Sequence, residues 1–443
     1  MPVSNIITRS DARTNTQVQT FSKPYIIAWA LGLIFYFLEY AVRSSPAVML
    51  PQLSQTFGVT AVGLSTILGM YYYTYSTVSL IAGVALDKVG AKYTVPIGIA
   101  ILGVGCLLFT MPHALAGDAG RLLQGAGSAF AFTGCVYLAS HGFAAGSLAT
   151  AIGFTQCFGM LGGSAGQFAI APSIQNGLPV SVYWIGIAIA CFVVCMALFF
   201  VTPAEAKSNT VADKKMSLLQ PYRIVFSNAQ SYLCGVVSGL LFAPTTIFAM
   251  TWGVAFLQQD RGFSFHTATL ASAMVPLGWV VGCPLLGWLA DKTGRRKPVL
   301  LAGILLMLLM LAQVFFMPQL LPVYATLFLF GVASGAAMIP YSIIKEVNPD
   351  TVKGSATGAI NFITFGVTAL LGPVFANLYG KTLGAAGSTK HFQSSGLFWL
   401  ATTAAAVLLC LLLKETGHTT EPRNKIYSSS QIAFDTAAVK CKK

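Results

Sequence analysis

The chain contains a succession of long apolar blocks, and these constrain its fold more than any other feature. Most blocks run for about 18 residues or more, the length that an α-helix needs to cross a hydrocarbon core about 30 Å thick. A lipid-facing β-barrel would instead show segments of about 10 residues with alternating polarity. Only 9% of the residues are charged, against roughly 25% in soluble domains. The sequence therefore predicts an all-α protein whose outer surface faces lipid.

Twelve apolar blocks predict twelve transmembrane helices in two bundles of six. The expected spans are 24–54, 60–86, 94–112, 117–140, 147–171, 180–202, 230–257, 266–290, 298–317, 321–345, 355–379 and 395–413. A polar stretch separates the sixth block from the seventh and is expected to be a cytoplasmic linker. The predicted organisation is an N-terminal segment, a first bundle, the linker, a second bundle and a C-terminal tail, at residues 1–23, 24–202, 203–229, 230–413 and 414–443.

The net charge of +13 is distributed as in a membrane protein rather than as in a nucleic-acid-binding protein. With twelve spans both termini lie on one side of the membrane, and that side holds most of the 26 Lys and Arg residues. The exceptions are Arg43, Arg121, Arg261, Lys381 and Lys390. Because Lys and Arg concentrate in cytoplasmic loops, both termini are predicted to be cytoplasmic. We expect the lipid bilayer as a partner, no nucleic acid, and a monomer.

The sequence contains no convincing motif of an enzyme or of a metal site. The nine cysteines fall almost entirely inside apolar blocks and form no CxxC spacing. The pentapeptide at 162–166 matches the G-x-S-x-G pattern of hydrolases, but that pattern needs a strand-to-helix turn, and here it lies within a predicted helix. We therefore expect no enzyme activity, no metal and no cofactor.

An internal repeat is the strongest single signal. Both copies read G-x-x-x-D-K-x-G followed by basic residues, one after the second predicted span and one after the eighth, 204 residues apart. In each copy the first glycine would let a neighbouring helix approach, the aspartate would pair with a cation or helix end, and the last glycine would turn the chain. The residues predicted to act in gating are Gly83, Asp87, Lys88, Gly90, Gly287, Asp291, Lys292, Gly294 and Arg295.

The doubled motif resembles the signature loop of the major facilitator superfamily, and the resemblance covers nearly the whole chain. The segment from Arg121 to Gly127 is similar to the family's R-x-x-x-G element, and Gly159 and Gly163 give a weaker match to its glycine-rich gating helix. The resemblance implies a secondary transporter that works by alternating access, with two six-helix halves rocking about a site near the bilayer midplane. It also implies a role in proton coupling or in locking the halves for Arg121. An interfacial pair with Asp118 is the alternative.

The first predicted span carries the sharpest candidate for a substrate site. Glu39 and Arg43 are four residues apart, so they share a helical face and can pair. Because ionisable residues at membrane depth are costly, each is by default a functional candidate. Arg43 would receive a carboxylate or phosphate through its planar fork, and Glu39 would accept a proton or an amino group. The alternative is a salt bridge that only neutralises two buried charges.

Polar and aromatic residues in other spans complete the predicted substrate site. Each could instead form a hydrogen bond between helices, an alternative that the sequence leaves open. The remaining candidates are Tyr40, Tyr71, Tyr75, Gln156, Trp252, Tyr341 and Asn361.

Several local details are similar to a sub-family of bacterial amino-acid importers, the phagosomal transporters. They are the stretch from Glu39 to Pro46, the tyrosines at 71–73, the Ile339-Pro340-Tyr341 run, Asn348-Pro349 and Gly354. This resemblance implies proton-coupled import of an amino acid across a bacterial inner membrane. The alternatives are an organic anion, such as a sugar acid or dicarboxylate, or a nucleoside. A pure anion site should show a second cation at mid-depth, and the second half offers none. A non-transporting receptor would need a soluble sensing domain, which the sequence does not show.

Overall fold

The computed structural model describes residues 22–143, 145–204, 220–316, 320–349, 352–382 and 389–417, and the regular structure within these ranges is helical throughout. The predicted N-terminal segment and C-terminal tail lie almost entirely outside the described residues. So does the central part of the predicted linker. The end of that linker forms a short helix, α9 (Gln220–Ser227).

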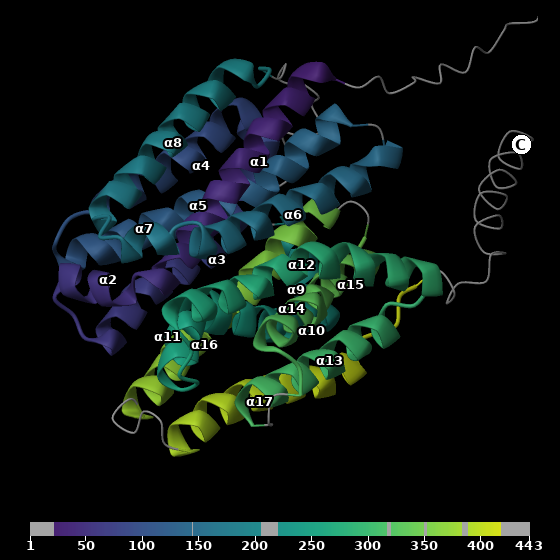
Figure 1. Cartoon of the computed structure of the whole chain (residues 1–443). Helices are drawn as coiled ribbons and strands as arrows, with labels where there is room; N and C mark the ends of the chain where they lie inside the picture. The colour runs from purple at the N-terminus through teal and green to yellow at the C-terminus, as the bar shows by residue number, and fades with distance from the viewer. Residues whose placement is uncertain are drawn as a thin grey trace, which may run out of the picture.

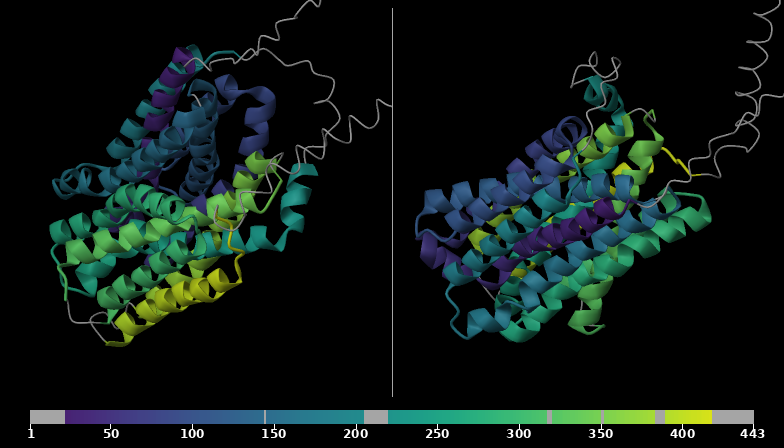
Figure 2. Two further views of the ribbon diagram at one scale, coloured as in Figure 1. Left: turned by 90° about the vertical axis from the view of Figure 1, so that its right-hand side faces the viewer. Right: turned by 90° about the horizontal axis from the view of Figure 1, so that it is seen from above.

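The helices fall into two groups that lie side by side (Figures 1 and 2). The first group comprises α1 (Lys23–Ser44), η1 (Ser45–Val48), α2 (Leu50–Phe57), α3 (Ala61–Val89), α4 (Ala91–Leu108), α5 (Ala114–Gly142), α6 (Ala145–Phe168), α7 (Ala171–Gln175) and α8 (Val180–Val201). The second comprises α10 (Ala229–Ala243), η2 (Pro244–Trp252), α11 (Gly253–Gln259), α12 (Phe265–Thr293), α13 (Lys297–Phe315), α14 (Val323–Ser334), η3 (Gly335–Met338), α15 (Ile339–Glu346), α16 (Lys353–Thr382) and α17 (Thr389–Leu412). The groups meet where α3 packs on α16 and α6 packs on α12.

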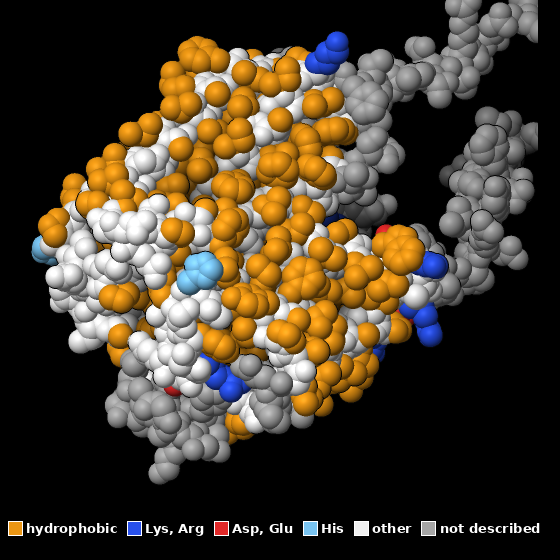
Figure 3. Space-filling view, in the orientation of Figure 1, with side chains coloured by type: hydrophobic (Ala, Val, Ile, Leu, Met, Phe, Trp, Pro, Cys, Tyr) orange, Lys and Arg blue, Asp and Glu red, His pale blue; other side chains and the backbone are white. Residues whose placement is uncertain are grey.

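Length and composition allow most of these helices to cross a membrane. Within the described residues, nine helices or runs of consecutive helices are long and apolar enough, and the bent pair α2–α3 would bring the number to ten. The two other expected spans correspond to α6 and α17, which are also helical. Figure 3 shows a surface that is mostly apolar on the visible face, with its few Lys and Arg side chains near the margins. This surface is that of a protein immersed in lipid.

The internal repeat is visible in how equivalent helices end. Gly90 ends α3 with a φ of 82° and Gly294 ends α12 with a φ of 64°, a region that only glycine enters without strain. Shortly after each glycine a lysine ammonium binds backbone carbonyls at the end of a distant helix. Lys92 reaches the end of α8 through the carbonyls of Phe199 and Thr202, and Lys297 reaches the end of α17 through those of Leu411 and Leu413.

Three spans depart from α-helical geometry near their middle or outer end. The first passes into the 3₁₀ turn η1 at Pro46, the seventh contains the nine-residue π-helix η2, and the tenth contains the 3₁₀ turn η3. Irregular backbone at membrane depth is tolerated where protein surrounds it. Here η1 of the first group contacts η2 of the second. One carbonyl of η2, that of Ala249, accepts hydrogen bonds from both groups, from Gln167 in α6 and from Ser272 in α12.

Candidate functional site

Glycines in α6 bring α1 close enough to present its charged face to the interior. A methyl group on Gly162 would lie 2.1 Å from the carbonyl oxygen of Phe37, and one on Gly166 would lie 2.5 Å from the hydroxyl of Ser44. Ser44 donates to the carbonyl of Gly163 at 2.7 Å. The G-x-S-x-G stretch is therefore a helix-packing surface, as its position within a predicted helix indicates.

Glu39, Arg43 and Tyr71 form one buried polar cluster. Glu39 Oε1 pairs with Arg43 Nη2, as their spacing predicts, and the Tyr71 hydroxyl donates to the same carboxylate oxygen. The guanidinium in turn donates to the Tyr71 oxygen through Nε at 3.3 Å and Nη2 at 3.2 Å. All three side chains are at most 1% exposed. Tyr71 thus links α3 to both charges of α1.

Aromatic rings surround the Arg43 guanidinium. Its central carbon lies 4.3 Å from the ring centroid of Tyr40, 5.0 Å from that of Tyr75 and 5.2 Å from that of Phe365. Rings at these distances attract a cation and exclude water from it. Phe365 belongs to α16, so the second half contributes to a cluster whose charges all come from the first.

Arg121 lies inside the bundle beside this cluster. Its Nη1 donates to the carbonyl of Val42 at 3.2 Å and to Gln124 Oε1 at 2.8 Å, and the residue is 2% exposed. Its guanidinium carbon is 4.9 Å from the ring centroid of Tyr71. The alternative of an interfacial pair with Asp118 is wrong, because these contacts hold Arg121 in the interior.

Three polar atoms of the cluster are buried without a hydrogen-bond partner. They are Glu39 Oε2, Arg43 Nη1 and Arg121 Nε. Buried donors and acceptors are rarely left unsatisfied, because each costs about 1–3 kcal/mol. Two unsatisfied guanidinium donors beside one carboxylate describe a site that can accept a further anionic group.

Two cavities flank the cluster without reaching it. One, of about 390 Å³, lies toward the end of the molecule expected to be extracellular and is lined by η1, the start of α3, and residues that include Trp252 and Gln258. The other, of about 270 Å³, lies toward the end expected to be cytoplasmic and is lined by residues that include Gln156, Cys283, Arg296 and Tyr341. Glu39 and Arg43 line neither cavity, so the cluster is closed off from both sides in this structure.

Tyr36 and Tyr40 separate the cytoplasmic-side cavity from Arg43. Gln156 lines the cavity and accepts from the Tyr36 hydroxyl at 3.2 Å, and the Tyr36 ring packs edge-on against Tyr40 at 5.1 Å. On the opposite wall Tyr341 donates to Asn361 Oδ1 at 2.6 Å. The structure thus brings Tyr40, Tyr71 and Tyr75 to the cluster and places Gln156, Tyr341 and Asn361 next to the cytoplasmic-side cavity. It places Trp252 at the other cavity, where its ring packs at a tilt against that of Tyr379.

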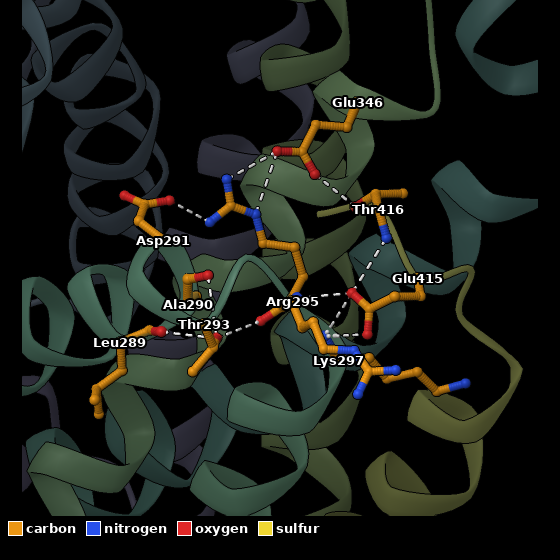
Figure 4. Close-up of polar contacts among 10 residues, drawn as sticks. Leu289, Ala290, Asp291, Thr293, Arg295, Lys297, Glu346, Glu415 and Thr416 are labelled. Carbon is orange, nitrogen blue, oxygen red and sulfur yellow. Dashed lines mark hydrogen bonds and ion pairs between the residues drawn. The ribbon is translucent and has the colours of Figure 1, made fainter. Parts of the chain in front are cut away.

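The second copy of the repeat forms an ionic network, shown in Figure 4. Asp291 pairs with Arg296, which also pairs with Glu346 at 3.0 Å. Arg296, rather than the predicted Arg295, thus forms the ion pairs. Its side chain joins the loop after α12 to the end of α15. Glu415 accepts from the backbone N–H groups of Arg296 and Lys297, which start α13. Lys292 lies over the ring of the exposed Trp288 at 4.7 Å.

The first glycine of each copy does not behave as predicted. No neighbouring atom lies within 4 Å of a methyl group built on Gly287, which lines the cytoplasmic-side cavity instead of packing on a helix. At Gly83 the nearest neighbour is the Tyr222 hydroxyl, at 3.7 Å. Lys88 is exposed at the end of α3, and the side chain of Asp87 lies outside the described residues.

Sequence reasoning missed Phe365, Tyr36 and the role of Arg296 in joining Asp291 to Glu346. Phe365 and Tyr36 carry no local signal, because an aromatic residue in an apolar span is also what lipid contact or core packing requires. Glu346 did have a signal, as one of the few acidic residues in the chain and at the end of a span.

Comparison with known proteins assigns the chain to a family. A model described as Major Facilitator Superfamily matches residues 32–373 and again residues 234–432. The chain is 25% identical over 397 residues to the probable sulfoacetate transporter SauU of Cupriavidus necator, covering 79% of this chain and 86% of that protein. It is 24% identical over 372 residues to the D-galactonate transporter of Escherichia coli O6:H1, covering 75% and 85%.

Solved structures show the same fold. A crystal structure of a mutant of the nucleoside transporter NupG superposes with a TM-score of 0.69 at 15% identity, covering 87% of this chain and 99% of that one. At this level of identity the likeness concerns the fold alone.

Proposed function

The chain belongs to the Major Facilitator Superfamily, and from that premise we propose that it carries a small organic anion, such as a sulfonate or a sugar acid, by proton-coupled alternating access. The observation that carries this proposal is the charge of the buried cluster. Arg43 and Arg121 lie against the same tyrosine ring, and Glu39 is the one carboxylate bound there among the described residues. One positive charge is in excess, and an anionic substrate would neutralise it.

The same geometry supports a coupling mechanism. Protonation of Glu39 would remove the charge that holds Arg43 and free its guanidinium for a carboxylate or sulfonate, which it can bind through two parallel hydrogen bonds. When the substrate leaves, Arg43 would pair with Glu39 again and favour loss of the proton. Substrate and proton would therefore travel together, inward when the outside is acidic.

The charge argument for an amino-acid substrate is weakened by the position of Arg121. A pure anion site was expected to show a second cation at mid-depth; the second half offers none, but Arg121 of the first half lies beside the cluster. The relatives named for sulfoacetate and D-galactonate agree with an anion.

We further propose a monomer in a bacterial inner membrane with both termini cytoplasmic. Support for the orientation comes from the distribution of Lys and Arg, which includes Lys292, Arg295, Arg296 and Lys297 at the junction of α12 and α13.

A transport assay tests the proposed function. Purified protein is first screened for thermal stabilisation by sulfoacetate, D-galactonate, neutral amino acids and nucleosides, since a ligand at 100 times its Kd stabilises by about 2.7 kcal/mol. Ligands that stabilise are then tested for uptake into proteoliposomes with an inward proton gradient. Saturable, gradient-dependent uptake of an anion is expected. Uptake of an amino acid or nucleoside with no anion uptake would overturn the proposal.

A further inference from the structure

Tyr222, in the linker helix α9, reaches between the two halves. Its hydroxyl donates to the backbone carbonyl of Leu80 in α3 at 2.9 Å, and the residue is only 8% exposed. A tyrosine in a short helix outside the predicted spans has no need to be buried for the stability of that helix. Its burial therefore results from contacts with the two helices on either side of it, α3 and α16.

Gly358 makes room for the phenol, and Gly83 of the other half lies beside it. A methyl group on Gly358 of α16 would lie 2.9 Å from the Tyr222 oxygen, closer than real Cβ contacts allow, and one on Gly83 of α3 would lie at 3.7 Å. Gly83 is the first glycine of the first repeat copy. The Tyr222 hydroxyl thus occupies a gap between α3 and α16 at the end of the molecule expected to be cytoplasmic.

Further contacts lie along the same boundary between α3 and α16, which we call the α3–α16 seam. Ser76 of α3 donates to the carbonyl of Phe362 in α16 at 2.7 Å. Phe362 also packs edge-on against Phe226 of α9, at 6.2 Å between ring centroids. The linker helix therefore contacts both sides of the α3–α16 seam, through Tyr222 and Phe226.

We propose that Tyr222 is a positioning residue of the transport cycle, which holds the cytoplasmic ends of α3 and α16 together and leaves the gap when the cytoplasmic side opens. The inference rests on the proposed alternating access and extends it by assigning the linker helix a part in the gate. Because α9 directly precedes α10, a movement of the second half pulls on the segment that carries this tyrosine.

The readout is the accessibility of a native cysteine. Cys283 lines the cytoplasmic-side cavity, so its labelling by a maleimide in inside-out membrane vesicles, located by peptide mapping, reports opening of that side without any substrate. Tyr222→Phe removes the hydrogen bond to Leu80 and keeps the ring. Losing such a bond costs about 1 kcal/mol, so labelling should become about fivefold faster.

A double-mutant cycle separates this contact from a general disturbance of the seam. Gly358→Ala should displace the hydroxyl and mimic Tyr222→Phe, but it should add almost nothing in a Tyr222→Phe background, where the clashing oxygen is absent. Gly354→Ala is the matched control, one turn earlier in α16 with no neighbouring atom within 4 Å. It should label at the wild-type rate.

Additive effects of Tyr222→Phe and Gly358→Ala would overturn the proposal, as would equal effects of Gly354→Ala and Gly358→Ala. An unchanged labelling rate in Tyr222→Phe would also overturn it, even in a protein that transports an anion. Conversely, the expected cycle in a protein that takes up no anion would leave the role of Tyr222 standing and refute the proposed substrate.

Discussion

Arg43 and Arg121 share one aromatic neighbour: their guanidinium carbons lie 5.2 and 4.9 Å from the ring centroid of Tyr71. Two like charges held this close in a buried site repel each other, since the low dielectric screens them poorly. Glu39 pairs with Arg43, while Arg121 is bound to a carbonyl and an amide. Further negative charge would reduce this repulsion, which is the basis of the predictions for this cluster.

Replacing Arg121 should separate substrate binding from stability. Arg121→Gln is expected to abolish anion uptake and the stabilisation by the anion, since the excess positive charge is removed. The unfolding temperature without substrate should stay the same or rise, because a buried charge without a carboxylate partner is also removed. Arg121→Lys, which keeps the charge and loses the fork, should retain part of the anion binding. Full anion binding by Arg121→Gln would contradict the assignment.

Replacing Glu39 should uncouple transport from protons. Wild-type uptake is expected to rise as the outside is acidified, because protonation of Glu39 frees Arg43. Glu39→Gln mimics the protonated state permanently, so its uptake should no longer respond to a proton gradient, while exchange of labelled for unlabelled anion continues. The measurement is uptake into proteoliposomes with and without the gradient. A variant that still concentrates the anion when the gradient is applied would rule out Glu39 as the coupling group.

The Tyr71 hydroxyl should contribute measurably to stability. It binds the carboxylate of Glu39 and the guanidinium of Arg43, so Tyr71→Phe leaves both buried charges short of a partner. We expect a loss of about 1–3 kcal/mol in the free energy of unfolding. Tyr73→Phe is the control, since Tyr73 is on the same helix and 40% exposed. Equal unfolding midpoints for the two variants would argue against the cluster as described.

The cluster also shows what a sequence can and cannot predict. The Glu39–Arg43 pair follows from helical periodicity, and the two halves follow from the repeated loop, because both are relations along one chain segment. The depth of Arg121 did not follow. The helix starts at Ala114 rather than near residue 117, so Arg121 lies two turns into it, about 10 Å from the helix start and in the interior.

Long-range contacts could not be predicted from the sequence, for a different physical reason. Phe365 reaches Arg43 across more than 320 residues of sequence, and Tyr222 reaches Leu80 across more than 140. Neither contact has a periodicity that hydropathy could reveal. Lipid-facing and interior positions are both apolar in these helices, so the pattern does not show which aromatic residues face inward.

The ionic network of the second repeat copy should control opening rather than stability. Arg296 bridges Asp291 and Glu346 near the surface, where such pairs contribute about 1 kcal/mol or less. Arg296→Gln should therefore change the unfolding midpoint little, yet it should speed maleimide labelling of Cys283 because the loop after α12 is released from α15. High salt should produce part of the same effect in the wild type by screening the pairs.

Arg295→Gln is the matched control, since the Arg295 side chain is exposed and makes no ion pair among the described residues. Equal labelling of the two variants would show that the network does not hold the cytoplasmic side closed.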